Sequence, residues 1–265
     1  MNAARPQLWQ WPNMLSIDAA AIALAWLWAF AHAYECELHW GAYCVLGASA
    51  WLVYTADRLF DVAKRSPVQL LSHRHRFAQV HASALWRLWL CVLSANIALA
   101  FTTLSSYQLR HGFVLLGAVL LYTRLNQKLS KRCFPKELCV ALIYAGGVIV
   151  FLDGPLPWLT ALSFALICFI NCVLIGTKEQ AIDHALQVDS LARRLGRSRL
   201  WLCFGLSALS LLLVPAPLQT GIASSLVLLA LLQIWSPRLP VETFRVLTDS
   251  TLFAGPLLLA LMAYD

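Results

Sequence analysis

Residues 39–62 read HWGAYCVLGASAWLVYTADRLFDV, an apolar run that ends in two aspartates, Asp57 and Asp61. A helix needs about 20 mostly apolar residues to cross a bilayer, and this run is long enough to do so. Residues four apart stack on one face of a helix. The run therefore predicts a membrane helix with two carboxylates on the same face near one end.

The composition extends this prediction from one helix to the whole chain. Of the 265 residues, 60% are hydrophobic and 12% are charged, and the mean hydropathy is +0.68. An ordinary globular domain is about 45–50% apolar and about 25% charged, so a soluble core could not bury this surplus. The same proportions exclude a disordered chain, a fibrous repeat and a small disulfide scaffold. The eight cysteines lie mostly in apolar runs without paired ligand spacing, which favours buried free thiols over disulfides or a zinc site.

We expect an all-α integral membrane protein, a bundle of about nine transmembrane helices that forms a single domain over residues 1–265. The nine apolar runs that predict these helices are 14–33, 39–62, 82–104, 111–125, 137–152, 156–176, 200–214, 221–235 and 247–264. The connections expected on the cytoplasmic side are 63–81, 126–136, 177–199 and 236–246. Helices and short loops then use essentially the whole chain, which leaves no room for a soluble domain.

The distribution of basic residues predicts the orientation. The net charge is +7, and in this topology all 20 lysines and arginines except Arg110 fall on one face of the membrane. The positive-inside rule assigns that face to the cytoplasm. We therefore expect a bacterial inner-membrane protein with a cytoplasmic N-terminus and an external C-terminus. The basic surplus is explained by topology and by contacts with anionic membrane lipids, so no nucleic acid partner is needed.

A second acidic pair repeats the spacing of the first near the end of the sixth run. Residues 178–183 read KEQAID, so Glu179 and Asp183 are also four residues apart. Four carboxylates that converge at a membrane boundary would repel one another unless a cation lies between them. Mg²⁺ is the natural ion, because it binds one or two carboxylates together with phosphate oxygens and water. For one pair alone, solvation of a helix end would be the simpler interpretation. Two matching pairs on the same face of the membrane instead favour a cation-binding site.

These motifs resemble those of the UbiA superfamily of intramembrane prenyltransferases, which form nine-helix bundles with two aspartate-rich motifs. Residues 56–61, ADRLFD, resemble the ADRxFD tail of the first motif, and residues 178–183 resemble the RDxxxD core of the second. Residues 121–123, LYT, the basic loop with Lys131 and Arg132, and residues 136–138, KEL, resemble the link between the fourth and fifth helices.

The chain also departs from the family pattern. Val53 and Tyr54 stand where the first motif normally opens with Asn-Asp, and Glu179 replaces the first aspartate of the second motif. The Arg-Pro-Leu-x-Ser-Gly stretch that often follows the first motif is replaced by residues 71–77, LSHRHRF. The Gly-Lys-Thr that usually follows the second motif is absent. The chain therefore resembles a divergent branch, with a site better suited to one metal ion than to two.

The resemblance implies a Mg²⁺-dependent transferase that ionises an allylic isoprenoid diphosphate and passes the isoprenoid to a lipophilic acceptor. The residues implied to act in catalysis and to hold Mg²⁺ are Asp57, Asp61, Glu179 and Asp183. The residues expected to bind substrate are Arg58, Arg74, Lys131, Tyr122, Asn171 and Lys178. For residues 73–76, a diphosphate clamp, a metal site and simple solvated charge all remain open.

Two alternative functions remain open at this stage. A terpene cyclase on the same scaffold would quench the carbocation within its own chain and would need no acceptor. A transporter or lipid-binding protein could use the acids to coordinate ions without chemistry. The acids lie at the cytoplasmic ends of the runs and not at the middle of the bilayer, which favours an enzyme over a transporter.

Three polar residues interrupt the apolar runs. Asp18, Asn171 and Asp249 are costly to expose to lipid, so their side chains are expected to face the interior of the bundle. Either a role in a functional cavity or hydrogen bonding between helices would explain them.

Overall fold

The computed structural model describes residues 6–63, 65–129, 134–152, 157–186 and 190–263, and these residues form helices without any strand. Lys131 of the predicted substrate site lies outside the described residues. The α-helices are α1 (Trp11–Met14), α2 (Ile17–Ala33), α3 (Trp40–Val62), α4 (His73–Val80), α5 (Ala82–Thr103), α6 (Ser106–Leu129), α7 (Lys136–Ile149), α8 (Trp158–Lys178), α9 (Gln180–Ala185), α10 (Leu191–Ser210), α11 (Ala216–Trp235), α12 (Val241–Thr251) and α13 (Ala254–Met262). Short 3₁₀ turns lie at Leu8–Gln10, Pro67–Gln69, Leu211–Leu213 and Ser236–Arg238.

The predicted apolar runs all overlap helices, but the count of nine membrane spans is not confirmed. In the described ranges, four helical segments are long and apolar enough to cross a bilayer: Ala82–Thr103, Trp158–Lys178, Ala216–Arg238 and Val241–Met262. Leu8–Met14 and Ile17–Ala33 would add a fifth if this pair, bent by 76°, forms one span. The helices α2 and α7 are only 17 and 14 residues long, which is why neither qualifies alone.

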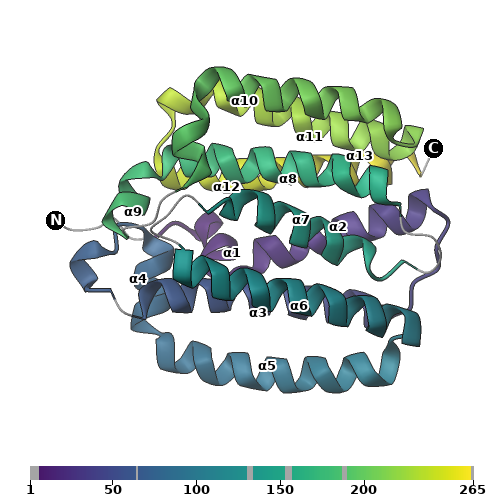
Figure 1. The fold of residues 1–265 in the computed structure, drawn as a ribbon, viewed down its shortest axis with the longest axis horizontal. Helices are drawn as coiled ribbons and strands as arrows, with labels where there is room; N and C mark the ends of the chain where they lie inside the picture. The colour runs from purple at the N-terminus through teal and green to yellow at the C-terminus, as the bar shows by residue number, and fades with distance from the viewer. Residues whose placement is uncertain (1–5, 64, 130–133, 153–156, 187–189, 264–265) are drawn as a thin grey trace.

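The long helices run side by side along the long axis of the bundle, and the short helices α4 and α9 lie together at one end (Figure 1). The centre is built from α2, α7, α8 and α11, whose apolar side chains form one continuous core. At its heart, the Trp26 ring lies 4.5 Å from the Phe164 ring and 6.3 Å from the Phe30 ring, measured between centroids. The Trp26 indole N–H donates to the carbonyl of Leu252, 2.8 Å away, which satisfies its polar atom inside the core.

The helix α5 lies at one edge of the bundle (Figure 1) and has no buried residue, although it is strongly apolar. A helix that is apolar all round is stable in an exposed position only where lipid replaces water. The surface of α5 therefore agrees with a membrane environment.

The segment that follows the first acidic pair corrects one expectation, because residues 63–81 do not form a simple loop. They contain the helix α4, which begins after Ser72. The Ser72 hydroxyl accepts a hydrogen bond from the backbone N–H of His75, as an N-cap residue does, and this local bond starts the helix. Phe77 then packs edge-on against Trp11 of α1, with ring centroids 5.7 Å apart.

A close contact between two glycines joins α11 to α13. A methyl group at Gly255 would lie 2.7 Å from the carbonyl oxygen of Gly221 and 2.8 Å from the Trp26 ring. The backbones of the two helices can approach this closely only because neither residue carries a side chain. The pair of glycines therefore sets the packing of the C-terminal helices against the core.

Substitution Gly255→Ala should destabilise the protein by about 1–3 kcal/mol, because the new methyl group overpacks this contact. The melting temperature in detergent, followed by tryptophan fluorescence, measures the effect. Gly117→Ala is the matched control, since a methyl group at this position of α6 would meet no atom of the described residues within 4 Å. Equal melting temperatures for both variants would contradict the packing described here.

Candidate functional site

The two acidic pairs lie at the same end of the bundle and are connected through α4. Asp57 and Asp61 lie in the last turns of α3, while Glu179 joins α8 to α9 and Asp183 lies in α9. Two consecutive residues of α4 each contact one of the pairs. The Arg74 guanidinium lies 2.9 Å from Glu179 Oε2 of the second pair, and His75 Nε2 lies 3.9 Å from Asp61 Oδ2 of the first pair. Residues more than a hundred positions apart in the sequence are thus brought to one site.

The His75 side chain is held neutral. Burial lowers the pKa of His75 to about 2, and the charges of Arg74 and Arg58 act in the same direction. The Ser72 hydroxyl lies 2.7 Å from its Nδ1 atom. The contact with Asp61 is therefore a polar contact of an uncharged imidazole and not an ion pair.

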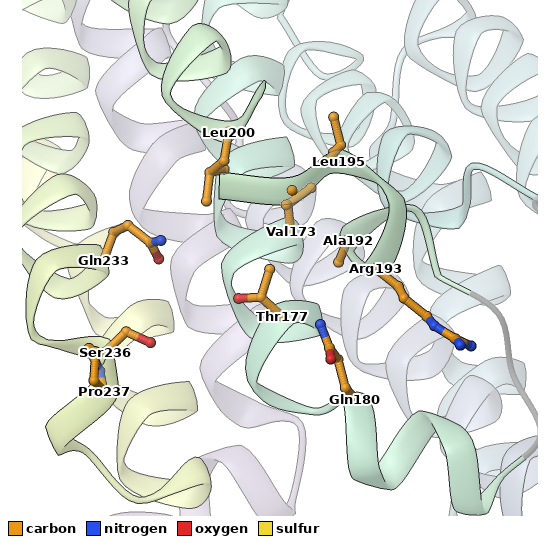
Figure 2. A pocket seen from close by; sticks show the side chains of 11 residues that line it. Val173, Thr177, Gln180, Ala192, Arg193, Leu195, Leu200, Gln233, Ser236 and Pro237 are labelled. Atoms are coloured by element: carbon orange, nitrogen blue, oxygen red, sulfur yellow. The ribbon is translucent and has the colours of Figure 1, made fainter. Parts of the chain in front are cut away.

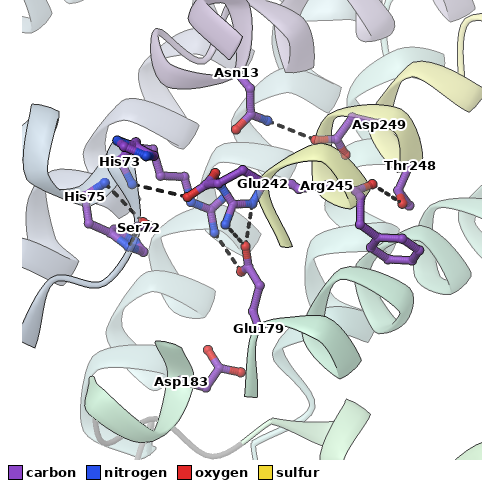
Figure 3. A network of polar contacts seen from close by, with 12 residues as sticks. Asn13, Ser72, His73, His75, Glu179, Asp183, Glu242, Arg245, Thr248 and Asp249 are labelled. Atoms are coloured by element: carbon purple, nitrogen blue, oxygen red, sulfur yellow. Dashed lines mark hydrogen bonds and ion pairs between the residues drawn. The ribbon is translucent and has the colours of Figure 1, made fainter. Parts of the chain in front are cut away.

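The most extensive polar network surrounds Glu179 (Figure 3). Glu179 accepts from Arg74 through Oε2 and from Arg245 through Oε1, and Arg245 also donates to Glu242 Oε2 at 2.7 Å. Glu242 Oε1 in turn accepts from the backbone N–H of His73, 3.2 Å away. We call this closed set of contacts the α4 ring, because it begins at His73 and returns to α4 at Arg74.

The ring keeps Glu179 ionised and places a guanidinium against each of its two carboxylate oxygens. Burial alone would raise the pKa of Glu179, but the charges of Arg74 and Arg245 outweigh burial and hold this pKa below its usual value. Each carboxylate oxygen already binds a guanidinium. The structure therefore gives Glu179 an ion-pairing role that the sequence did not indicate, and its role as a Mg²⁺ ligand stays a prediction that no contact supports.

The other acids keep oxygens available. Asp183 Oδ1 lies 3.5 Å from Lys136 Nζ, whereas Asp183 Oδ2 is buried without a hydrogen-bond partner among the described residues. Burial raises the pKa of Asp183, and the charge of Lys136 partly offsets this effect. Asp57 is exposed, and the Asp61 side chain is 38% exposed. In the described part of the chain, no three His, Cys, Asp or Glu side chains lie close enough together to hold a metal ion by themselves.

Three of the predicted substrate-binding residues donate hydrogen bonds inside the protein, and their binding of substrate stays a prediction. Arg58 Nη1 donates to the carbonyls of Asn13 and Met14, at 2.5 and 2.9 Å. Asn171 donates to the carbonyl of Thr248 and Lys178 to that of Leu239, each at 3.0 Å. A donor in an apolar interior must find an acceptor, so these side chains join helices to one another.

Tyr122 lies on α6 and is half-buried, with its ring centroid 6.2 Å from that of Phe134. Its binding role stays a prediction, as does that of Lys131.

The sequence analysis assigned no site role to three charged residues at this end of the bundle, Lys136, Glu242 and Arg245. Lys136 Nζ lies 3.5 Å from Asp183 Oδ1, and, against the effect of burial, its positive charge lowers the pKa of Glu179 and of Asp183. Glu242 and Arg245 complete the α4 ring from α12. A signal was present for these two, because they form an i,i+3 pair at the start of an otherwise apolar segment.

A second polar cluster explains the acids inside the apolar runs. The Asn13 amide donates to Asp18 Oδ2 at 2.6 Å and to Asp249 Oδ2 at 3.0 Å (Figure 3 shows the second bond). Together with the bond from Asn171 to Thr248, these contacts support hydrogen bonding between helices as the role of the three interior polar residues.

A pocket of about 290 Å³ lies beside the site, between α8, α10 and α11. Thr177, Gln180, Gln233 and Ser236 supply neutral polar groups that point toward it, whereas the Arg193 side chain points away (Figure 2). Apart from Arg193, the residues that line this pocket are uncharged, so the pocket is chemically distinct from the acidic end of the bundle.

The comparison with known proteins agrees with this architecture. No family model and no curated protein matches the sequence. Among solved structures, the chain is similar to the apo structure of a UbiA homolog from Aeropyrum pernix K1, with 16% sequence identity and a TM-score of 0.63. The alignment covers 94% of this chain and 98% of that chain.

These observations define an all-helical integral membrane protein with a charged site at one end of the bundle. Its fold is that of a UbiA homolog, which confirms at the level of the fold the resemblance that the two acidic motifs indicated.

The contacts of Arg58 yield a test of its structural role. Arg58→Met should destabilise the protein by about 2 kcal/mol without any ligand, because two buried carbonyls lose their donor. Thermal unfolding in detergent measures this loss. The control is Arg87→Met, since Arg87 is exposed on α5 and donates to the Ser83 carbonyl within the same helix. An unchanged melting temperature for Arg58→Met would contradict the structural role.

Proposed function

We propose that the protein is an intramembrane prenyltransferase of the UbiA type that acts on an allylic isoprenoid diphosphate with Mg²⁺. The observation that carries this proposal is that two acidic pairs lie with Arg74, His75 and Lys136 at one end of an apolar bundle, one pair on α3 and the other at the start of α9. Acids and cations together suit a substrate that carries both phosphate oxygens and a divalent metal. The similarity to a UbiA fold supports the proposal.

The residues present fit Mg²⁺ as the cofactor. Asp183 Oδ2 is a buried acceptor without a partner among the described residues, and a hard cation satisfies such an oxygen. Asp57 and Asp61 offer further carboxylate oxygens that are accessible. These three aspartates would hold the ion, together with diphosphate oxygens and water. When bound, Mg²⁺ neutralises the charge that develops on the departing diphosphate.

The side chains around the acids have separate tasks in this mechanism. Arg74 and Lys136 carry fixed positive charges that bind and orient the non-bridging oxygens of the diphosphate. His75 is neutral, so it contributes a polar contact without adding charge. The apolar bundle beyond the acids accommodates the isoprenoid and excludes water, which protects an allylic carbocation from premature quenching.

The placement in the membrane follows from the distribution of basic residues. We infer a nine-helix bundle in the bacterial inner membrane, with the site and the N-terminus cytoplasmic and the C-terminus outside. The isoprenoid diphosphate then arrives from the cytoplasmic face, and the lipophilic acceptor arrives from the bilayer. A terpene cyclase on the same scaffold is the alternative, in which no acceptor takes part.

Pyrophosphate release from geranyl, farnesyl and longer allylic diphosphates by the purified protein tests the proposal. Release should require Mg²⁺, and Asp57→Asn or Asp183→Asn should each lower it by about 100-fold, because each change removes a charge that holds the metal. Glu37→Gln is the matched control, since this exposed acid lies at the opposite end of α3, before His39.

The outcome separates the candidate functions. Release that survives both aspartate substitutions would show that the proposed site is wrong. A folded protein that releases nothing with any chain length would favour the non-catalytic transporter or lipid-binding function. A product that lacks an acceptor group would identify the cyclase.

A further inference from the structure

The α4 ring is a closed, charge-balanced unit. It contains two carboxylates, Glu179 and Glu242, and two guanidiniums, Arg74 and Arg245. The Arg245 side chain is 1% exposed and that of Glu179 is 7% exposed. Because the charges cancel within the ring, none of its members needs an external ion to be stable in this apolar surrounding.

The position of Glu179 in the ring argues against metal binding by this residue. A metal ion at either Glu179 oxygen would lie beside a guanidinium that already binds this oxygen, so the positive charges of Arg74 and Arg245 would repel it. Asp183 is four residues away and instead has an oxygen without a hydrogen-bond partner in the described part of the chain. The two acids of the second motif therefore have different environments: one is engaged with arginines and the other is available to a cation.

The ring holds α4 at two points. Glu242 Oε1 accepts from the backbone N–H of His73 at the start of the helix, and Glu179 Oε2 accepts from Arg74 Nη2 in the next residue. The remaining Nε atom of Arg74 is buried and has no hydrogen-bond partner among the described residues. Arg74 precedes His75, whose Nε2 atom lies 3.9 Å from Asp61 Oδ2, so this arginine stands on α4 next to the residue that contacts the first acidic pair. An unsatisfied guanidinium N–H in this place suits a phosphate oxygen.

We propose that Glu179 is a positioning residue and not a metal ligand, and that Arg245 and Glu242 act with it to fix Arg74 for binding the diphosphate. The inference rests on the proposed function and deepens it, because it assigns the two acids of the second motif to different tasks. Asp183 binds the cation, and Glu179 orients an arginine.

Metal binding and pyrophosphate binding are measured separately to test this division. Mn²⁺ serves as the metal probe, followed by electron paramagnetic resonance, and inorganic pyrophosphate serves as the anion probe, followed by calorimetry in the presence of Mn²⁺. The main variant is the double substitution Glu179→Gln with Arg245→Gln, which removes one charge of each sign and keeps the ring neutral. Asp183→Asn is the matched single change in the same motif.

The double variant should keep the Mn²⁺ affinity of the wild type and should bind pyrophosphate about tenfold more weakly, as loss of one charge-assisted hydrogen bond implies. Asp183→Asn should weaken Mn²⁺ binding by at least about tenfold, because it removes a carboxylate charge from the ion. Adding Arg74→Gln to the double variant should cause no further loss of pyrophosphate affinity, since the ring acts through Arg74. Loss of Mn²⁺ binding in the double variant, or full additivity with Arg74→Gln, would overturn the inference.

Hydrogen exchange of α4 in the unliganded protein distinguishes failure of the ring from failure of the proposed function. The double variant should lose amide protection in His73–Val80 while the core helix α8 keeps it. Unchanged protection of α4 would overturn the positioning role whatever the protein binds. The remaining outcome is that the wild type binds neither Mn²⁺ nor pyrophosphate while the double variant still loses protection of α4. This result would confirm that the ring holds α4, and it would contradict both the metal-dependent function and the binding of diphosphate by Arg74.

Discussion

The structure depends on one constraint: a charge inside an apolar bundle must be compensated where it lies. An unpaired ion in such a medium costs several kcal/mol, so each buried charged group needs a partner of opposite charge or several hydrogen bonds. Arg245 is almost completely buried and contacts two glutamates, while Arg58 is buried and donates to two carbonyls. The contacts of Arg58 join α3 to α1, and those of Arg245, together with the bonds from His73 and Arg74, join α12 to α4 and to the junction of α8 and α9.

The same constraint separates the acids into two groups with different chemistry. Glu179 and Glu242 are neutralised by arginines, and Asp18 and Asp249 share the amide of Asn13. Asp57, Asp61 and Asp183 have fewer partners of opposite charge, so they are the acids of the two motifs that remain available to a cation. Whether a carboxylate is free to bind a cation therefore depends on the side chains that contact it more than on its position in a sequence motif.

Several features could be predicted from the sequence because they are local. Helix formation in the apolar runs follows from side-chain hydrophobicity, and the i,i+4 spacing places Asp57 with Asp61 on α3 before any tertiary contact forms. The helix α4 could not be predicted in the same way. Its start depends on the Ser72 cap, and its position depends on Glu242, which lies about 170 residues later in the chain.

Composition, charge distribution and motif spacing by themselves determined that this is a helical membrane protein with two acidic pairs, and the motifs around those pairs resemble those of the UbiA superfamily. Only the tertiary structure decided which of those acids are engaged by other side chains, because that depends on arginines contributed by distant helices. Arg245 and Glu179 are 66 positions apart and form their contact only when α12 packs beside α8. Spacing along a helix can place two carboxylates on one face, but the partner that neutralises a carboxylate is selected by packing.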